Sequence, residues 1–172
     1  YDKMSQLFTL DLPNKEIKVG LFESLLPYYL EGMYAEEGDV AIAQMSVLIR
    51  QGDMDGALRL LQEFLGTVPY CNNTNYEGHY QQVLFIIFTL LTHFVVDVEV
   101  HTPNGRVDVV METEDTLYLI ELKLNKSAQS AMQQINLKQY GQRFARCGKP
   151  IVKVGVNFDA KKGNIEDWII EP

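Results

Sequence analysis

The feature that most constrains the fold is the stretch GRVDVVMETEDTLYLIELKL at residues 105–124. Apolar side chains recur at every second position on both sides of a short polar centre, and this is the period of β-strands. The sequence therefore predicts two antiparallel strands joined by a tight turn. A symmetric turn centred between Glu114 and Asp115 sets Asp108 opposite Glu121, with Val107, Val109 and Met111 on the other, wholly apolar face.

Two carboxylates in this register form an unusual pair. Directly opposed residues have Cβ atoms roughly 4.5–5.5 Å apart, so Asp108 and Glu121 repel each other unless a cation lies between them. Lys123 projects on the same face as Glu121, and a divalent ion with oxygen ligands would complete the neutralisation. The pattern predicts a metal-dependent hydrolytic site. The alternative is a salt bridge on a solvated face, which the apolar run LYLIEL disfavours because such a strand is typically covered on both sides.

The motif GRVD at 105–108 followed by Glu121-Leu122-Lys123 resembles the PD-(D/E)xK nuclease superfamily. Together with NYEGHYQ, LIELKLNKSAQSAMQQI and VKVGVNFD, it resembles the nuclease domain at the carboxyl end of bacterial AAA-ATPase-like proteins. PNKEIKVGLFESLLPYY resembles the helical segment that precedes this domain. The resemblance implies an α/β fold of the α+β mixed-sheet type. A helical segment would cover 1–69, and a restriction-endonuclease-like αβββαβ core 70–172.

The resemblance also implies a reaction, the hydrolysis of phosphodiester bonds with Mg²⁺ or Mn²⁺. Asp108, Glu121 and the Leu122 carbonyl are then the expected metal ligands. Lys123 would orient or deprotonate the attacking water. The competing hypothesis is a catalytically inactive nuclease-fold module that binds protein or nucleic acid beside an ATPase-like domain. The chain has no GxxxxGK[ST] loop, so that ATPase part would lie elsewhere in the full-length protein.

Three further residues are candidates for the site. Glu77 either closes a capping box with Thr74 or, as the resemblance implies, reaches the metal or its water from the first core helix. Gln134 matches a glutamine that helps to build the site in RecB-type nucleases, with Tyr140 as its partner. The alternative for Gln134 and Tyr140 is a helix-flanking polar residue and a packing aromatic.

Glu99 would lie beside Asp108 as a metal ligand if Thr102 faces Gly105, whereas a turn one residue further on would place His101 there.

Charge along the chain is uneven. The net charge of −8 is composed of −13 over residues 1–122, +8 over 123–162 and −3 over 163–172. The basic block 123–162 begins at Lys123, where phosphates would be held. We therefore expect nucleic acid, with DNA favoured, to lie along this block. The alternative is an ordinary solvated helix face.

Composition indicates a globular chain, with 47% hydrophobic and 22% charged residues. Its longest apolar run, about 14 residues, is shorter than the roughly 20 needed to cross a bilayer, and no signal peptide is visible. Cys71 and Cys147 lack the spacing of a zinc site, so we expect free thiols in a reducing cytoplasm.

The remaining sequence predicts helices before and between the strands. Asp39 is the expected cap of a helix to about Gln51, and Asp53 of a second to Leu65, closed by Gly66. Asn125 or Ser127 would cap a helix to about Arg146, which crosses over to a parallel strand. The other expected elements are a strand-like LFTLDL, a helix over 17–34, a boundary at 67–73, a helix to about Phe94, and strands at 95–102, 150–158 and 164–171.

Overall fold

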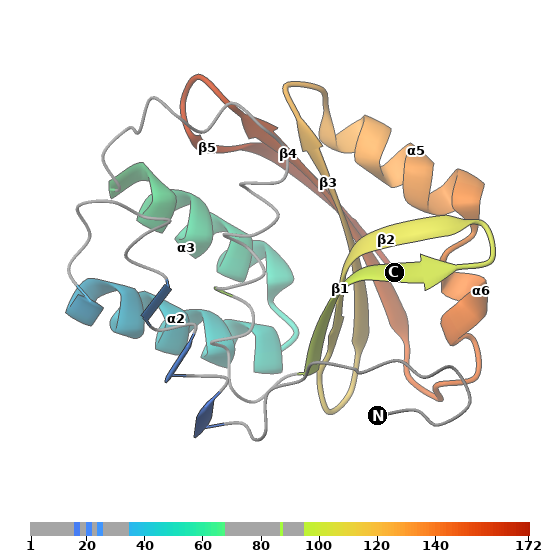
Figure 1. Ribbon diagram of the computed structural model, residues 1–172, viewed down its shortest axis with the longest axis horizontal. Coiled ribbons are helices and arrows are strands. Elements are labelled where there is room, and N and C mark those ends of the chain that lie inside the picture. The colour runs from blue at the N-terminus through green and yellow to red at the C-terminus, as the bar shows by residue number, and fades with distance from the viewer. Residues whose placement is uncertain (1–15, 18–19, 22–23, 26–34, 68–86, 88–94) are drawn as a thin grey trace, which may run out of the picture.

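The computed structural model describes residues 16–17, 20–21, 24–25, 35–67, 87 and 95–172. Helices lie on both sides of a mixed sheet (Figure 1). On one side are α2 (Ala35–Arg50) and α3 (Met54–Thr67), and on the other α5 (Ala128–Lys138) and the short α6 (Gly141–Phe144). The strands are β1 (Val95–Thr102), β2 (Gly105–Glu112), β3 (Leu117–Leu124), β4 (Ile151–Asp159) and β5 (Asn164–Glu171).

Among the described residues the sheet has five strands in the order β1-β2-β3-β4-β5. The pairing of β3 with β4 is parallel, and the other three pairings are antiparallel. Because parallel neighbours need a crossover, α5 and α6 carry the chain back to the start of β4. The expected mixed sheet with a helical crossover is confirmed.

The β2–β3 hairpin has the register of the expected symmetric turn, and the β1–β2 hairpin has one of the two registers that the sequence left open. Thr113 donates its N–H to the Thr116 carbonyl at 2.9 Å, which closes the symmetric turn between β2 and β3. In the first hairpin Thr102 pairs with Gly105, and Gly105 has a φ of 151°, a conformation that favours glycine. This register settles the open choice: Glu99 falls opposite Asp108, and His101 pairs with Arg106.

Two hydrophobic clusters hold the layers together. The larger joins α2 and α3 to one face of the sheet, with Met45, Leu58 and Leu61 packed with Val109 and Ile120. The smaller joins α5 to the other face, through Val110, Leu119, Met132, Ile135 and Tyr140.

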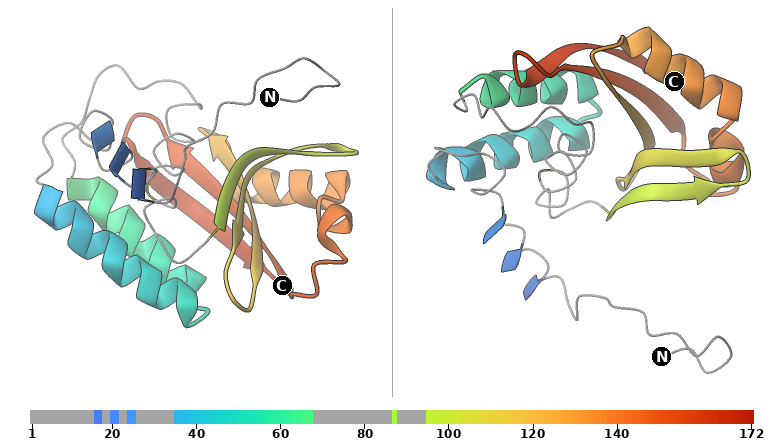
Figure 2. Two further views of the ribbon diagram at one scale, coloured as in Figure 1. Left: turned by 60° about the horizontal axis from the view of Figure 1, so that its bottom comes forward. Right: turned by 45° about the horizontal axis from the view of Figure 1, so that its top comes forward.

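Val107 departs from the predicted apolar face of β2. It packs in the smaller cluster, whereas Val109 and Met111 belong to the larger one. Figure 2 shows that the β1–β2 hairpin curls toward α5 and α6. Val107 accordingly packs with Ile135 and Tyr140 on that side of the sheet.

Helix boundaries differ from the predicted ones most clearly at the start of α2 and the end of α5. The helix α2 begins at Ala35, so Asp39 lies inside it and is not its cap. The helix α5 ends at Lys138 instead of about Arg146, because Gln139 takes a left-handed conformation and Tyr140 turns inward to become 1% exposed. The pattern of apolar residues along the sequence does not reveal that α5 ends at Lys138.

Two caps are confirmed. Asp53 accepts the Gly56 N–H at 2.8 Å at the start of α3, which then continues past Gly66 to Thr67. Ser127 accepts the Ser130 N–H at 3.1 Å and is the N-cap of α5. Asn125 does not cap this helix. It takes a left-handed conformation and accepts the Ala160 N–H at 2.9 Å.

Several predictions fall outside the described residues: LFTLDL, most of the helix at 17–34, nearly all of the boundary at 67–73 and the helix to Phe94. Only Ile87 of that last helix is described, and it is helical and fully buried. The boundary between 1–69 and 70–172 stays a prediction. Among the described helices, none has the length and apolar character to cross a bilayer.

Candidate active site

Asp108 lies where the ladder between β2 and β3 stops. The paired residues of these strands run from Glu112–Leu117 to Val109–Ile120. One position further, a carboxylate oxygen of Asp108 accepts the Leu122 N–H at 2.9 Å. Asp108 is buried, at 8% exposure. This hydrogen bond therefore fixes an acidic side chain against the backbone of the neighbouring strand.

Glu121 and Lys123 lie beside it on β3. The Lys123 ammonium donates to Glu121 Oε1 at 2.9 Å and to the Leu122 carbonyl at 3.1 Å. Glu121 is 1% exposed, and its second oxygen, Oε2, has no hydrogen-bond partner among the described residues. The structure therefore brings together the three residues of the predicted motif and the Leu122 carbonyl.

The electrostatics of this group are unbalanced. Burial, and then the negative charge of Asp108, raise the pKa of Glu121 from 4.5 to about 7, and the hydrogen bond from Lys123 lowers it by less. One ammonium thus does not compensate two buried carboxylates. A second cation at this position would bind favourably.

The oxygen atoms present fit a hard divalent ion. Two carboxylates and a backbone carbonyl are the ligand types that Mg²⁺ and Mn²⁺ accept, and Glu121 Oε2 is a buried acceptor for which the described part of the chain provides no donor. Among the described residues there is no cluster of three or more His, Cys, Asp or Glu side chains arranged for a metal. Asp108 and Glu121 are the two acidic side chains of the motif.

The strand β4 supports the site from the other side. Glu121 pairs with Gly155, and a Cβ at Gly155 would lie 2.7 Å from the Ala128 carbonyl oxygen of α5. Glycine is therefore required for α5 to pack this closely over the sheet. The start of α5 then lies next to the buried carboxylates.

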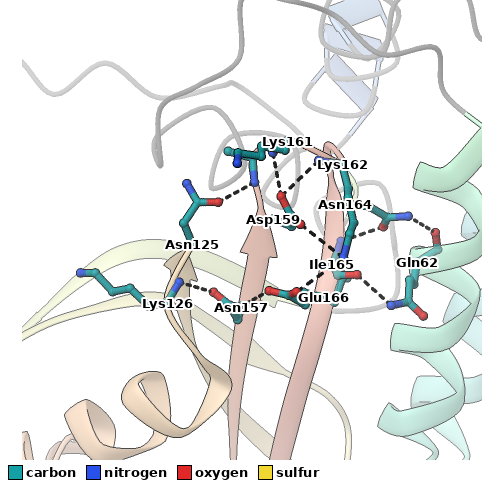
Figure 3. A network of polar contacts seen from close by, with 11 residues as sticks. Gln62, Asn125, Lys126, Asn157, Asp159, Lys161, Lys162, Asn164, Ile165 and Glu166 are labelled. Atoms are coloured by element: carbon teal, nitrogen blue, oxygen red, sulfur yellow. Dashed lines mark hydrogen bonds and ion pairs between the residues drawn. The ribbon is translucent and has the colours of Figure 1, made fainter.

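Asn157 was not identified from the sequence. It pairs with Lys123 across the parallel ladder, is 1% exposed and accepts the Lys126 N–H at 2.9 Å. Its amide donates to Glu166 Oε2 at 3.1 Å (Figure 3). The register of β4 and β5 shifts between Asn157 and Phe158, a bulge of the kind that redirects side chains near active sites. The one available signal was a single amide inside the apolar strand VKVGVNF.

The structure says less about the other three predicted site residues. Gln134 lies on α5 and its amide donates to the Tyr140 hydroxyl at 3.3 Å, so the predicted pair does meet. Glu99 falls opposite Asp108 in the register of β1, but its side chain is outside the described set, and Glu77 lies wholly outside it. The roles of Gln134, Glu99 and Glu77 stay predictions.

Comparison with known proteins agrees with this geometry. The family model described as "PD-(D/E)XK nuclease superfamily" matches residues 75–168, which contain the motif and all five strands up to Trp168. The chain is 31% identical over 173 residues to a protein of Azotobacter chroococcum mcd 1 described as "Uncharacterized protein in vnfD 5'region". The match covers 95% of this chain and 33% of that protein, so the chain spans about a third of its relative's length. No solved structure matches.

The mixed sheet with its helical crossover is consistent with the restriction-endonuclease-like fold of this family. Motif, fold and family match therefore coincide on the same strands. The chain belongs to the PD-(D/E)XK nuclease superfamily.

Proposed function

We propose that this chain is a metal-dependent nuclease that hydrolyses phosphodiester bonds of nucleic acid, with DNA favoured over RNA. The observation that supports it most directly is the buried group of Asp108, Glu121 and Lys123, in which one oxygen of Glu121 has no donor among the residues that the structure describes. A structural salt bridge between Lys123 and Glu121 does not require a second buried carboxylate, and the charge of Asp108 raises the pKa of Glu121.

Each residue has a separate task. Asp108, Glu121 and the Leu122 carbonyl would hold Mg²⁺ or Mn²⁺, which when bound polarises the phosphate and makes an attacking water more acidic. The Leu122 N–H keeps Asp108 in place. The Lys123 ammonium lies 2.9 Å from Glu121 and would orient the water or neutralise the charge that develops on the phosphate. Glu77, Glu99 and Gln134 are proposed to complete the site, Glu77 and Glu99 as metal ligands.

The test compares cleavage of plasmid and single-stranded DNA in Mg²⁺, Mn²⁺ or EDTA. Asp108→Asn and Lys123→Gln retain polar groups of similar size, and we expect each to reduce cleavage at least about 100-fold. Lys149→Gln is the matched control, because Lys149 is also a partly buried lysine paired with a glutamate, Glu112, but lies away from the site. Undiminished cleavage by either site variant would remove the assignment.

Glu77 is tested by Glu77→Gln. Glutamine can still close a capping box with Thr74, so the variant retains helix stability under either interpretation. Reduced cleavage at an unchanged melting temperature would assign the carboxylate to the site, and full cleavage would return it to a capping role.

The competing proposal is a non-catalytic binding module. The Lys123 ammonium already bonds to Glu121 and to the Leu122 carbonyl, so part of the negative charge of the site is neutralised without a metal. Mn²⁺ titration distinguishes the two. Binding that depends on Asp108 and Glu121 supports the nuclease, and binding that survives their replacement supports the module.

We also propose an ATPase-like domain elsewhere in the full-length protein and a cytoplasmic location. The first is supported by the resemblance of the 70–172 segment and by a relative about three times as long. The second is supported by Cys147, an exposed free thiol that a reducing compartment would preserve.

A further inference from the structure

The segment from Leu124 to Phe158 contains no Asp or Glu, although the chain carries 23 of them. It contains six Lys and Arg residues. A segment with only positive charges repels itself unless its cations are paired with other parts of the molecule or are available to an external anion. The structure shows which of these cations are paired and which are available to an external anion.

Some cations of the basic block are already engaged. The Lys149 ammonium bonds to Glu112 Oε1 at 2.8 Å and to the Thr113 carbonyl at 2.6 Å. The Lys153 ammonium bonds to Asn136 Oδ1 at 2.8 Å. Outside the acid-free segment, Lys162 lies between Asp159 and Glu166. These side chains brace the fold, and a substrate would have to displace their partners.

Four exposed cations of the segment have no carboxylate within ion-pair distance in the described part of the chain. Lys126 lies just after β3, and the other three are close to one another in sequence: Lys138 at the end of α5, Arg143 in α6 and Arg146 just beyond it. Leu137, next to Lys138, is 82% exposed. We call Leu137, Lys138, Arg143 and Arg146 the α5–α6 surface.

This surface lies on the face of the sheet that carries the site. Leu117 and Leu119 of β3 pack with Met132 and Ile135 of α5, and Glu121 and Lys123 continue the same alternation. The helix α5 begins beside Gly155, the partner of Glu121, and runs toward the opposite end of β3. Its 11 residues span about 16 Å at 1.5 Å per residue, which separates the α5–α6 surface from Lys123 by about 15–20 Å.

Exposed amides lie between Lys123 and the α5–α6 surface. Gln129, Gln133 and Leu137 follow at a spacing of four residues and form one outward ridge of α5. Amides bond to phosphate and sugar oxygens, cations neutralise phosphates, and an exposed leucine packs on sugars or base edges. A protein partner with an acidic patch would match the cations but would not need such an extended ridge.

We propose that the α5–α6 surface binds the flank of the nucleic acid, about 15–20 Å from the bond that is cut. This inference rests on the proposed function, since it assigns the substrate's path across that same site. At about 3.4 Å per nucleotide, the separation corresponds to about four to six nucleotides. Substrates shorter than this would occupy the site without reaching the surface.

Binding is measured first, in EDTA, as the affinity for a fluorescein-labelled duplex at several salt concentrations. Arg143→Ala/Arg146→Ala should reduce the slope of log affinity against log salt by about 1.8, since each phosphate contact contributes about 0.9. The matched control is Arg50→Ala/Arg59→Ala, which removes two arginines from α2 and α3 on the other side of the sheet and should leave the slope unchanged. Leu137→Ala should weaken binding several-fold at every salt concentration without changing the slope.

Cleavage is measured second, on duplexes from about 4 to about 24 base pairs, a range that brackets the separation at about 3.4 Å per base pair. For the natural sequence, kcat/KM should rise with length and level off once one flank exceeds about six base pairs. For Arg143→Ala/Arg146→Ala this rise should be lost, while cleavage of the shortest duplexes is unchanged.

The outcomes separate the two proposals. A reduced salt slope in EDTA with no cleavage in Mg²⁺ would refute the nuclease and retain the surface. Cleavage with the same salt slope and the same length dependence in both double variants would overturn the surface and retain the nuclease. The α5–α6 surface would also be overturned if Arg143→Ala/Arg146→Ala no longer bound an acidic protein but bound nucleic acid with unchanged affinity.

Discussion

Among the residues that the structure describes, Glu121 has the most strongly shifted pKa. It is 1% exposed and lies beside Asp108. One of its oxygens is bonded to Lys123, and the other has no donor within the described ranges. Burial and the Asp108 charge raise its pKa to about 7. Without a metal, the folded protein thus disfavours the ionised carboxylate, and the site is a local weakness of the fold.

Glu121→Gln should therefore stabilise the metal-free protein at pH 8. The pKa of this carboxyl rises from 4.5 to about 7 on folding, so between these values the folded state binds more protons and stability falls as pH increases. Glutamine does not titrate. The variant should gain about 1–3 kcal/mol over the natural sequence between pH 4.5 and 8, at about 1.4 kcal/mol per pKa unit.

Urea unfolding in EDTA at pH 4.5 and pH 8 measures this difference. Adding Mg²⁺ at pH 8 should stabilise the natural sequence and leave the Gln variant nearly unaffected. An equal free energy of unfolding for the two proteins at both pH values would contradict the assignment of Glu121 as a strained carboxylate.

At the scale of elements, α5, β4 and β5 together hold the chain that follows the site. The two elements approach closely at Gly155, and the loop between β3 and α5 is held by side chains from β4 and β5. Asn157 holds the Lys126 N–H, and Asp167 accepts the Ala128 N–H at 3.1 Å. These contacts fix the chain immediately after Lys123.

Gly155→Ala should destabilise the protein by about 1–3 kcal/mol, the usual effect of overpacking. The added Cβ would lie 2.7 Å from the Ala128 oxygen and 3.0 Å from the Met132 nitrogen, and these backbone atoms cannot move without shifting α5. Gly66→Ala is the control. Gly66 lies inside α3, and the nearest atom to its added Cβ would be the Asn164 side-chain nitrogen of β5 at 3.4 Å, so the substitution should be neutral or stabilising by up to about 1 kcal/mol. Thermal unfolding of both variants measures the contrast.

Asn157→Ala should reduce kcat about 10–100-fold with little change in KM, because a small displacement of a catalytic group costs about this much. The loss of its two hydrogen bonds should also lower stability by about 1–3 kcal/mol. Gln62→Ala removes a bond of 2.8 Å to the Ile165 carbonyl at the far end of the same network (Figure 3). It should lower stability without changing kcat. Equal kcat values for the two variants would reduce Asn157 to a packing role.

At the scale of the whole molecule, the helical layer and the sheet share one core. The larger cluster combines Met45 and Leu61 of the helices with Ile120 and Val154 of the sheet. Trp168 of β5 donates its indole N–H to Asp55 of α3 at 2.8 Å, and the Arg59 guanidinium lies over the Trp168 ring. The sheet face opposite the site is therefore covered by α2 and α3.

A fragment of residues 70–172 should not unfold cooperatively by itself. Without α2 and α3 the sheet would expose Val109, Ile120 and Val154, which are fully buried in the whole chain. Each such side chain contributes about 1.5–3 kcal/mol on burial, and a domain has only about 5–15 kcal/mol in total. Calorimetry of the fragment and of the full chain tests this. A sharp transition in the fragment would show that 1–69 is a separate unit.

The sequence by itself determined the strands and their chemistry. Alternation is a local property, so β1 and β5 were predicted with correct bounds. The symmetric turn predicted the β2–β3 register, in which Asp108 and Glu121 lie one position beyond the last pair of the ladder. The family of the chain followed from the same short motif, since the motif and its flanks are contiguous in sequence.

Only the tertiary structure decided the rest, because it depends on contacts between distant segments. The curl of the first hairpin moved Val107 to the α5 side, and the burial of Tyr140 ended α5 at Lys138. Asn157 joined the site through parallel pairing with Lys123, 34 positions earlier. The same fold determined which lysines of the basic block are paired. A charge count cannot distinguish a lysine that braces a turn from an arginine that faces solvent, since the difference lies in which carboxylate the fold brings within reach.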